Sequence, residues 1–132
     1  MQQVNYIAVL VAALSSFLLG GLWYSKILFG PAWHRSAGTP TQDPGARHPA
    51  RVFGLSFLFA LVAAFAYAWL MPPAANAMAG LIQGLIVGAG IVAMSFGINY
   101  QFANRSTVLW LIDGGYHSVQ FALYGLILGV WR

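Results

Sequence analysis

Cysteine is absent from this 132-residue chain, and charged side chains are scarce. Without cysteine the chain has no disulfide framework, no CxxCH haem attachment and no thiolate metal site. Charged residues make up 6% of the chain, with two acidic side chains against six lysines and arginines. Because a soluble domain carries roughly 25% charged residues, this composition argues against a soluble protein.

Apolar side chains dominate the composition. Hydrophobic residues make up 60% of the chain, and the mean hydropathy is +0.73. A span needs ~20 apolar residues to cross the bilayer, so the length allows about four. We expect an all-α, integral membrane four-helix bundle in one transmembrane domain, 1–132. The first apolar run has no basic segment before it, so we expect it to be retained as a span. The predicted spans are about 4–25, 51–71, 77–100 and 107–131, with a cytoplasmic loop at 30–50.

Basic residues gather in two of the connections between spans. Lys26, Arg35, Arg47 and Arg51 surround the first connection and Arg105 lies in the third. The positive-inside rule makes both connections cytoplasmic and both termini periplasmic, as in a multi-pass protein of a bacterial inner membrane. Topology thus accounts for the positive charge, so we expect no nucleic-acid partner. Anionic lipid at the basic loop is a candidate partner.

A polar stripe interrupts the last span, which reads "LWLIDGGYHSVQFALYG". Asp113, His117 and Gln120 are spaced i, i+4 and i+7, which places them on one helix face, and Tyr116 flanks that face. An Asp at the centre of a span costs ~2.5–3.5 kcal/mol on insertion scales. The stripe therefore predicts either a functional site, such as a proton or cation relay, or hydrogen bonds that hold the helices together.

Depth in the bilayer suggests partners for the stripe. In an antiparallel layout Ser95 and Asn99 lie near the level of Asp113, and Lys26 is the flexible cation able to reach the same carboxylate. A Lys26–Asp113 salt bridge would keep the Asp ionised. The candidate intramembrane polar site comprises Asp113, Tyr116, His117, Gln120, Asn99, Ser95 and Lys26.

Metal, cofactor and enzyme functions find little support in the sequence. Only one histidine lies within a predicted span, since His34 and His48 belong to the basic loop. The chain has no nucleophile elbow, no HExxH and no phosphate-cradling loop. We therefore expect no metal, no cofactor and no enzymatic activity.

Glycines repeat every four residues in "GLIQGLIVGAG". Gly80, Gly84 and Gly88 form a flat face on which another helix can approach closely, and Gly125 with Gly129 offers a second such face. Packing inside one bundle and a homodimer are both consistent with this pattern.

Three segments resemble the membrane proteins grouped as domain of unknown function 1761: "GLWYSKILFGPAWHR", "FGINYQFANRS" and "LIDGGYHSVQFALYGLILGVW". The resemblance leaves out only the loop from about Ala37 to Pro49. It implies a bacterial inner-membrane protein with four helices, without an established activity or catalytic residues. One departure is visible, because Lys26 stands where the family has proline and Pro31 where it has lysine.

Two classes of function follow. In the first, the protein is an accessory or assembly subunit, oligomeric or part of a larger membrane complex, and the Asp/His stripe holds its helices together. In the alternative, it is a homo-oligomeric proton, cation or small-solute transporter or channel that uses the stripe.

Overall fold

A computed structural model describes residues 3–37, 48–73 and 75–131, and these residues form helices and connections without any strand. The prediction of an all-helical protein is confirmed. Along the chain the helices are α1 (Tyr6–Trp23), α2 (Gly30–Ala37), α3 (Pro49–Leu70), α4 (Ala77–Leu85), the π-helix η1 (Ile86–Val92), α5 (Ala93–Phe102) and α6 (Thr107–Val130).

Polar side chains fix where the helices begin. Asn5 accepts hydrogen bonds from the backbone N–H groups of Ile7 and Ala8, each at 3.1 Å, at the start of α1. Asn76 and Ser106 cap α4 and α6 in the same way. Such caps satisfy backbone donors that would otherwise lack partners at a helix start.

Among the described residues, three helical stretches are long and apolar enough to cross a membrane: Tyr6–Trp23, Pro49–Leu70 and Ala77–Phe102, each with a mean hydropathy of 2.0. The last comprises α4, η1 and α5 in one continuous helix. Its middle turns adopt π geometry, which the sequence did not predict. Helix α6 is 24 residues long but does not reach the same hydropathy, because it carries Asp113, His117 and Gln120.

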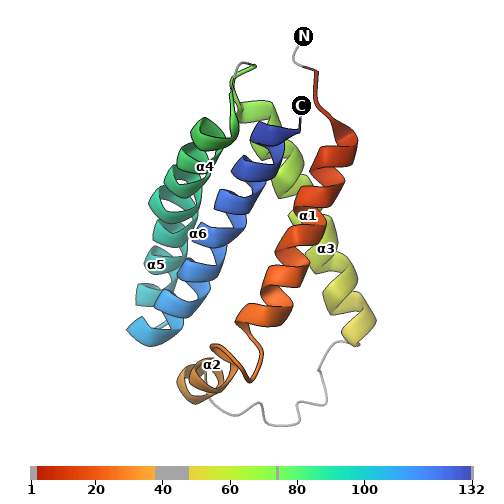
Figure 1. Ribbon diagram of the computed structural model, residues 1–132. Coiled ribbons are helices and arrows are strands. Elements are labelled where there is room, and N and C mark those ends of the chain that lie inside the picture. The colour runs from red at the N-terminus through yellow and green to blue at the C-terminus, as the bar shows by residue number, and fades with distance from the viewer. Residues whose placement is uncertain (1–2, 38–47, 74, 132) are drawn as a thin grey trace.

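The most polar of the long helices lies at the centre. Helix α6 contacts each of the other helices of the described chain, and α4–η1–α5 flanks it on one side with α1 and α3 on the other (Figure 1). The cost of its polar side chains is reduced by this position, because neighbouring helices supply hydrogen-bond partners and shield them from lipid.

The glycine face of α4 and η1 packs inside the chain. A Cβ atom on Gly80 or Gly84 would collide with the backbone of α6 at Gly125 or Phe121. The Tyr67 hydroxyl on α3 donates to the Gly80 carbonyl at 2.8 Å, so a third helix is joined at the same place. Of the two arrangements consistent with the sequence, the structure contains the intramolecular one, and these glycines are not free to face a second copy.

The remaining glycines of that prediction lie in the same interface. Gly88 of η1 packs against His117 and Ser118 of α6, and Gly129 near the end of α6 packs against Asn76.

Part of the predicted loop 30–50 is helical. Residues 30–37 form α2, which crosses one end of the molecule beneath α6 (Figure 1). Gly30 starts this helix in a tight turn, where a Cβ atom would lie 2.6 Å from the Tyr24 carbonyl oxygen. Residues 38–47 of the predicted loop, including Arg47, lie outside the described residues.

Candidate functional site

Asp113 on α6 accepts hydrogen bonds from three aromatic side chains. The Tyr24 hydroxyl donates to its Oδ1 at 2.6 Å and the Trp33 indole N–H to the same oxygen at 3.1 Å. The Tyr100 hydroxyl donates to Oδ2. We call these four residues the Asp113 cluster. Asp113 is 8% exposed, and both carboxylate oxygens are occupied.

The donors come from three separate parts of the chain. Tyr24 directly follows α1, Trp33 lies on α2 and Tyr100 lies on α5. The backbone between α1 and α2 folds back on itself, because Phe29 N–H donates to the Trp23 carbonyl at 2.9 Å. The Trp23 indole in turn donates to the Ile112 carbonyl, at 2.9 Å, beside the carboxylate. One side chain of α6 therefore joins the residue after α1, Trp33 of α2 and the last turn of α5.

The sequence alone did not identify these donors. In the sequence, Tyr24 and Trp33 follow the first apolar run and are typical of an aromatic belt at the membrane interface, and Tyr100 is only the predicted end of a span. The available signal was the excess of aromatic groups with a polar tip around an acidic residue, because a buried Tyr or Trp needs an acceptor.

Other residues of the predicted site lie elsewhere. Ser95 is exposed and donates to the Ile91 carbonyl of its own helix at 2.9 Å. Asn99 and Lys26 are exposed as well. Among the described residues neither bonds to Asp113, so the predicted Lys26–Asp113 salt bridge is not formed here. The carboxylate instead accepts hydrogen bonds from the aromatic side chains of Tyr24, Trp33 and Tyr100, which occupy both of its oxygens.

His117 and Gln120 belong to a second set of polar groups. His117 Nδ1 lies 2.6 Å from Gln120 Oε1. Gln120 Nε2 donates to the Tyr124 hydroxyl oxygen at 2.8 Å, and that hydroxyl lies 3.2 Å from Ser16 Oγ. We call these four residues the His117 network. In the described part of the chain no hydrogen bond joins His117 to Asp113, so the predicted stripe divides into two clusters.

Tyr116 lies between the two clusters. Its hydroxyl donates to the Ser16 carbonyl at 2.8 Å, which ties α6 to α1. Its ring contacts those of Tyr24 and His117, with centroid separations of 5.5 and 4.9 Å. The contact between the clusters is therefore made by aromatic rings, which do not relay protons along hydrogen bonds.

The directions of the bonds in the His117 network follow from the number of protons. Ser16 donates its hydroxyl proton to the Ala13 carbonyl at 2.7 Å. Tyr124 has one proton, which it donates to the Ala60 carbonyl or to Ser16 Oγ, each at 3.2 Å. Its oxygen therefore accepts from the Gln120 amide nitrogen, and Gln120 Oε1 faces His117. Since a carbonyl oxygen only accepts, His117 Nδ1 carries a proton.

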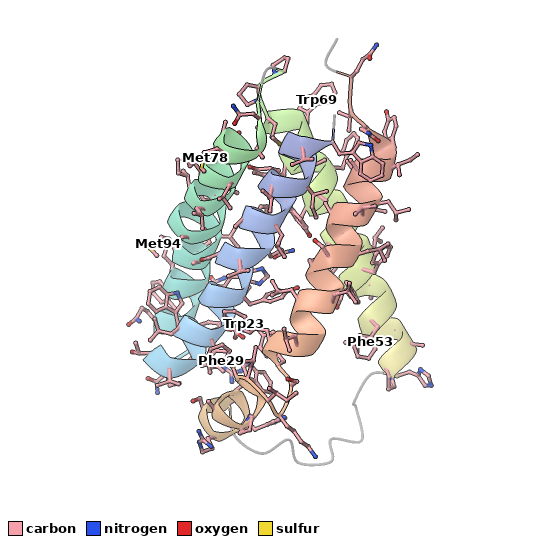
Figure 2. All side chains as sticks on the ribbon, viewed as in Figure 1. Trp23, Phe29, Phe53, Trp69, Met78 and Met94 are labelled. Carbon is pink, nitrogen blue, oxygen red and sulfur yellow. The ribbon has the colours of Figure 1, made fainter. Side chains whose placement is uncertain are left out.

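A groove of about 730 Å³ runs beside the His117 network. Its walls come from α1, the first half of α3, Val92 at the end of η1, and α6. Helix α3 diverges from α5 toward the α2 end of the molecule (Figure 1), and Phe53 lies on this diverging half (Figure 2). The lining is largely apolar, and its polar members include Ser56, His117 and Gln120.

No cluster of three or more His, Cys, Asp or Glu side chains suited to a metal ion occurs among residues 3–37, 48–73 and 75–131. The chemistry that the described polar groups offer is hydrogen bonding. The Asp113 cluster uses its acceptors internally, whereas His117 lines an open groove.

Comparison with known proteins gives one match. A family model described as "Protein of unknown function (DUF1761)" matches residues 7–129. No curated protein and no solved structure matches the chain. The matched range extends from α1 to α6, so it includes both the Asp113 cluster and the groove.

Proposed function

Because the chain belongs to the DUF1761 family, whose description assigns no activity, we propose a function from its geometry: a four-span membrane protein that acts as an accessory or assembly subunit. In this proposal Asp113 holds the helices together through hydrogen bonds and does not conduct ions. The protein acts through contacts with other membrane components.

The single observation that carries this proposal is that both carboxylate oxygens of Asp113 already accept hydrogen bonds from within the chain. Three donors from three parts of the chain occupy its two oxygens. Hydrogen bonds to a charged group contribute about 1.5–3 kcal/mol each. Together they exceed the ~2.5–3.5 kcal/mol cost of an Asp near the centre of a span. A conducting carboxylate needs an oxygen that water or an ion can reach, and this arrangement offers little room for one.

The four-helix bundle and its orientation are part of the proposal. Helix α6 has 24 residues, which at 1.5 Å per residue is about 36 Å, enough to cross ~30 Å of hydrocarbon. Lys26 and Arg35 belong to the α1–α2 turn and α2, Arg51 to the start of α3, and Arg105 to the α5–α6 connection. These segments lie at the α2 end of the molecule, while both ends of the described chain lie at the other (Figure 1). By the positive-inside rule the α2 end is cytoplasmic and the termini are periplasmic, in a bacterial inner membrane.

The surface available to a partner is apolar and helical. Leu10, Leu14 and Leu18 point outward along α1, with exposed fractions of 43, 47 and 78%. They suit a lipid tail, a second copy or a helix of a larger complex. The basic α2 end suits anionic lipid headgroups, at ~1 kcal/mol per basic residue near the surface.

Ion flux in proteoliposomes tests the proposal. Wild type, Asp113→Asn and, as a matched control, Asn99→Ala are reconstituted at equal density and assayed for proton and potassium flux. We expect no flux from any of them, and a lower midpoint of thermal unfolding only for Asp113→Asn. Flux in wild type that Asp113→Asn abolishes at unchanged stability would overturn the structural role.

A small-solute transporter is the second candidate, and the groove favours it. The groove brings His117, an ionisable group, to an open surface within the helices. Flux that survives in Asp113→Asn and is lost in His117→Ala would support this candidate over the accessory role.

A further inference from the structure

We propose that the groove between α1, α3 and α6 binds a membrane-dissolved molecule with an apolar body and a hydroxyl head, and that the head donates to His117 Nε2. This inference goes beyond the accessory role, because it requires no partner protein.

His117 presents an unused acceptor. Its Nδ1 donates to Gln120, so in the neutral imidazole Nε2 carries a lone pair. In the described part of the chain Nε2 has no hydrogen-bond partner, whereas every buried side-chain nitrogen or oxygen there has one. Nε2 therefore lies at an accessible surface. His117 lines the groove, and we infer that Nε2 is exposed there.

The imidazole is held in one orientation. Its ring stacks on Phe96 of α5 with a centroid separation of 4.8 Å and an interplanar angle of 23°, and Tyr116 packs edge-on at 4.9 Å. With Nδ1 fixed by Gln120 as well, the ring cannot turn Nε2 away without losing these contacts. A positioned acceptor in an apolar surround favours a ligand that brings its own donor.

Another polar side chain of the groove, Ser56, indicates which chemical group the head carries. Ser56 on α3 lines the same groove, and its hydroxyl has no partner among the residues that the structure describes. A hydroxyl both donates and accepts, so it can bond to His117 and to a serine. An ether or ester oxygen can only accept, and a quaternary ammonium does neither.

The size and place of the groove indicate a small lipophilic molecule. Its volume of about 730 Å³ lies within the ~300–1,000 Å³ of small-molecule sites. The side chains along its α3 wall, Val52, Phe53 and Phe59, are exposed, so a molecule dissolved in the bilayer can enter sideways.

The π-helix adds an independent observation. Residues of η1 face α6 at this level, where a Cβ atom on Gly88 would lie 2.7 Å from the His117 carbonyl oxygen. Val92, at the end of η1, contributes to the groove wall. Single turns of π-helix inside α-helices occur frequently at functional sites.

The test compares two probes that differ in one donor, 1-dodecanol and dodecyl methyl ether. Each is titrated into wild-type protein labelled with ¹⁵N-histidine in nanodiscs, and the His117 resonance is assigned with His117→Phe. We expect the alcohol to shift the Nε2 resonance and to bind about five- to tenfold more tightly than the ether. A difference of this size corresponds to one hydrogen bond. Equal affinities, or an unmoved Nε2 resonance, would overturn the proposal.

Two variants and one control variant show where the probe binds. His117→Phe keeps the stacked ring and removes the acceptor, so both probes should bind with the affinity of the ether. Ala63→Phe narrows the groove from α3, so both affinities should fall together, whereas Ser95→Ala, on the exposed side of α5, should change neither. A preference for the alcohol that persists in His117→Phe, or binding unaffected by Ala63→Phe, would place the molecule elsewhere and refute the inference.

Discussion

Replacing Asp113 with leucine removes the acceptor shared by Tyr24, Trp33 and Tyr100 and adds no polar group. A buried donor left without an acceptor costs about 1–3 kcal/mol. The three donors are only half-buried, so the lower end of that range applies to each. We therefore expect the free energy of unfolding to fall by about 3 kcal/mol.

Asparagine at the same position should cost less. Its carbonyl oxygen can still accept from Tyr24 and Trp33, and the Tyr100 hydroxyl can rotate to accept from the new amide. Only the charge assistance of the bonds is lost, so we expect a decrease of about 1–1.5 kcal/mol. The order wild type, Asp113→Asn, Asp113→Leu is a direct consequence of the geometry of the cluster.

Unfolding by sodium dodecyl sulfate in mixed micelles, followed by tryptophan fluorescence, measures these differences. Tyr24→Phe provides a double-mutant cycle: it should cost about 1.5 kcal/mol in wild type and close to nothing in Asp113→Leu, because its acceptor is already gone. The reasoning fails if Asp113→Leu is as stable as wild type, or if Tyr24→Phe has the same effect in both backgrounds.

Three further predictions concern packing, charge and topology. Gly84→Ala should destabilise the protein by about 1–3 kcal/mol, because its Cβ would meet the α6 backbone, whereas Gly90→Ala on the same helix meets open space and should be neutral; equal midpoints of thermal unfolding would contradict the packing. Lys26→Gln should leave the free energy of unfolding in sodium dodecyl sulfate unchanged within about 0.5 kcal/mol. A larger loss would show that Lys26 does form a salt bridge with Asp113. In this cysteine-free chain, a membrane-impermeant maleimide added to intact cells should label Pro73→Cys and not Gln101→Cys, and the reverse pattern would invert the topology.

Local sequence patterns determined a large part of this protein. The scarcity of charge and the long apolar runs indicate membrane-like helices, because the composition leaves no other means of satisfying the backbone in lipid. The spacing of Asp113, His117 and Gln120 predicted that one helix carries a polar face, and the glycine repeat predicted a close helix contact. These properties depend only on residue type and helical period.

Only the tertiary structure decided which groups meet. Tyr24 and Asp113 are 89 positions apart in the chain, and no periodicity links them. Their contact requires the α1–α2 turn to fold back and α6 to lie at the centre. The same packing assigns the glycines to an internal interface, separates His117 from Asp113 and leaves a groove beside His117. Helical period fixes the face on which a side chain lies, but the partner on the facing helix depends on how the helices pack in three dimensions.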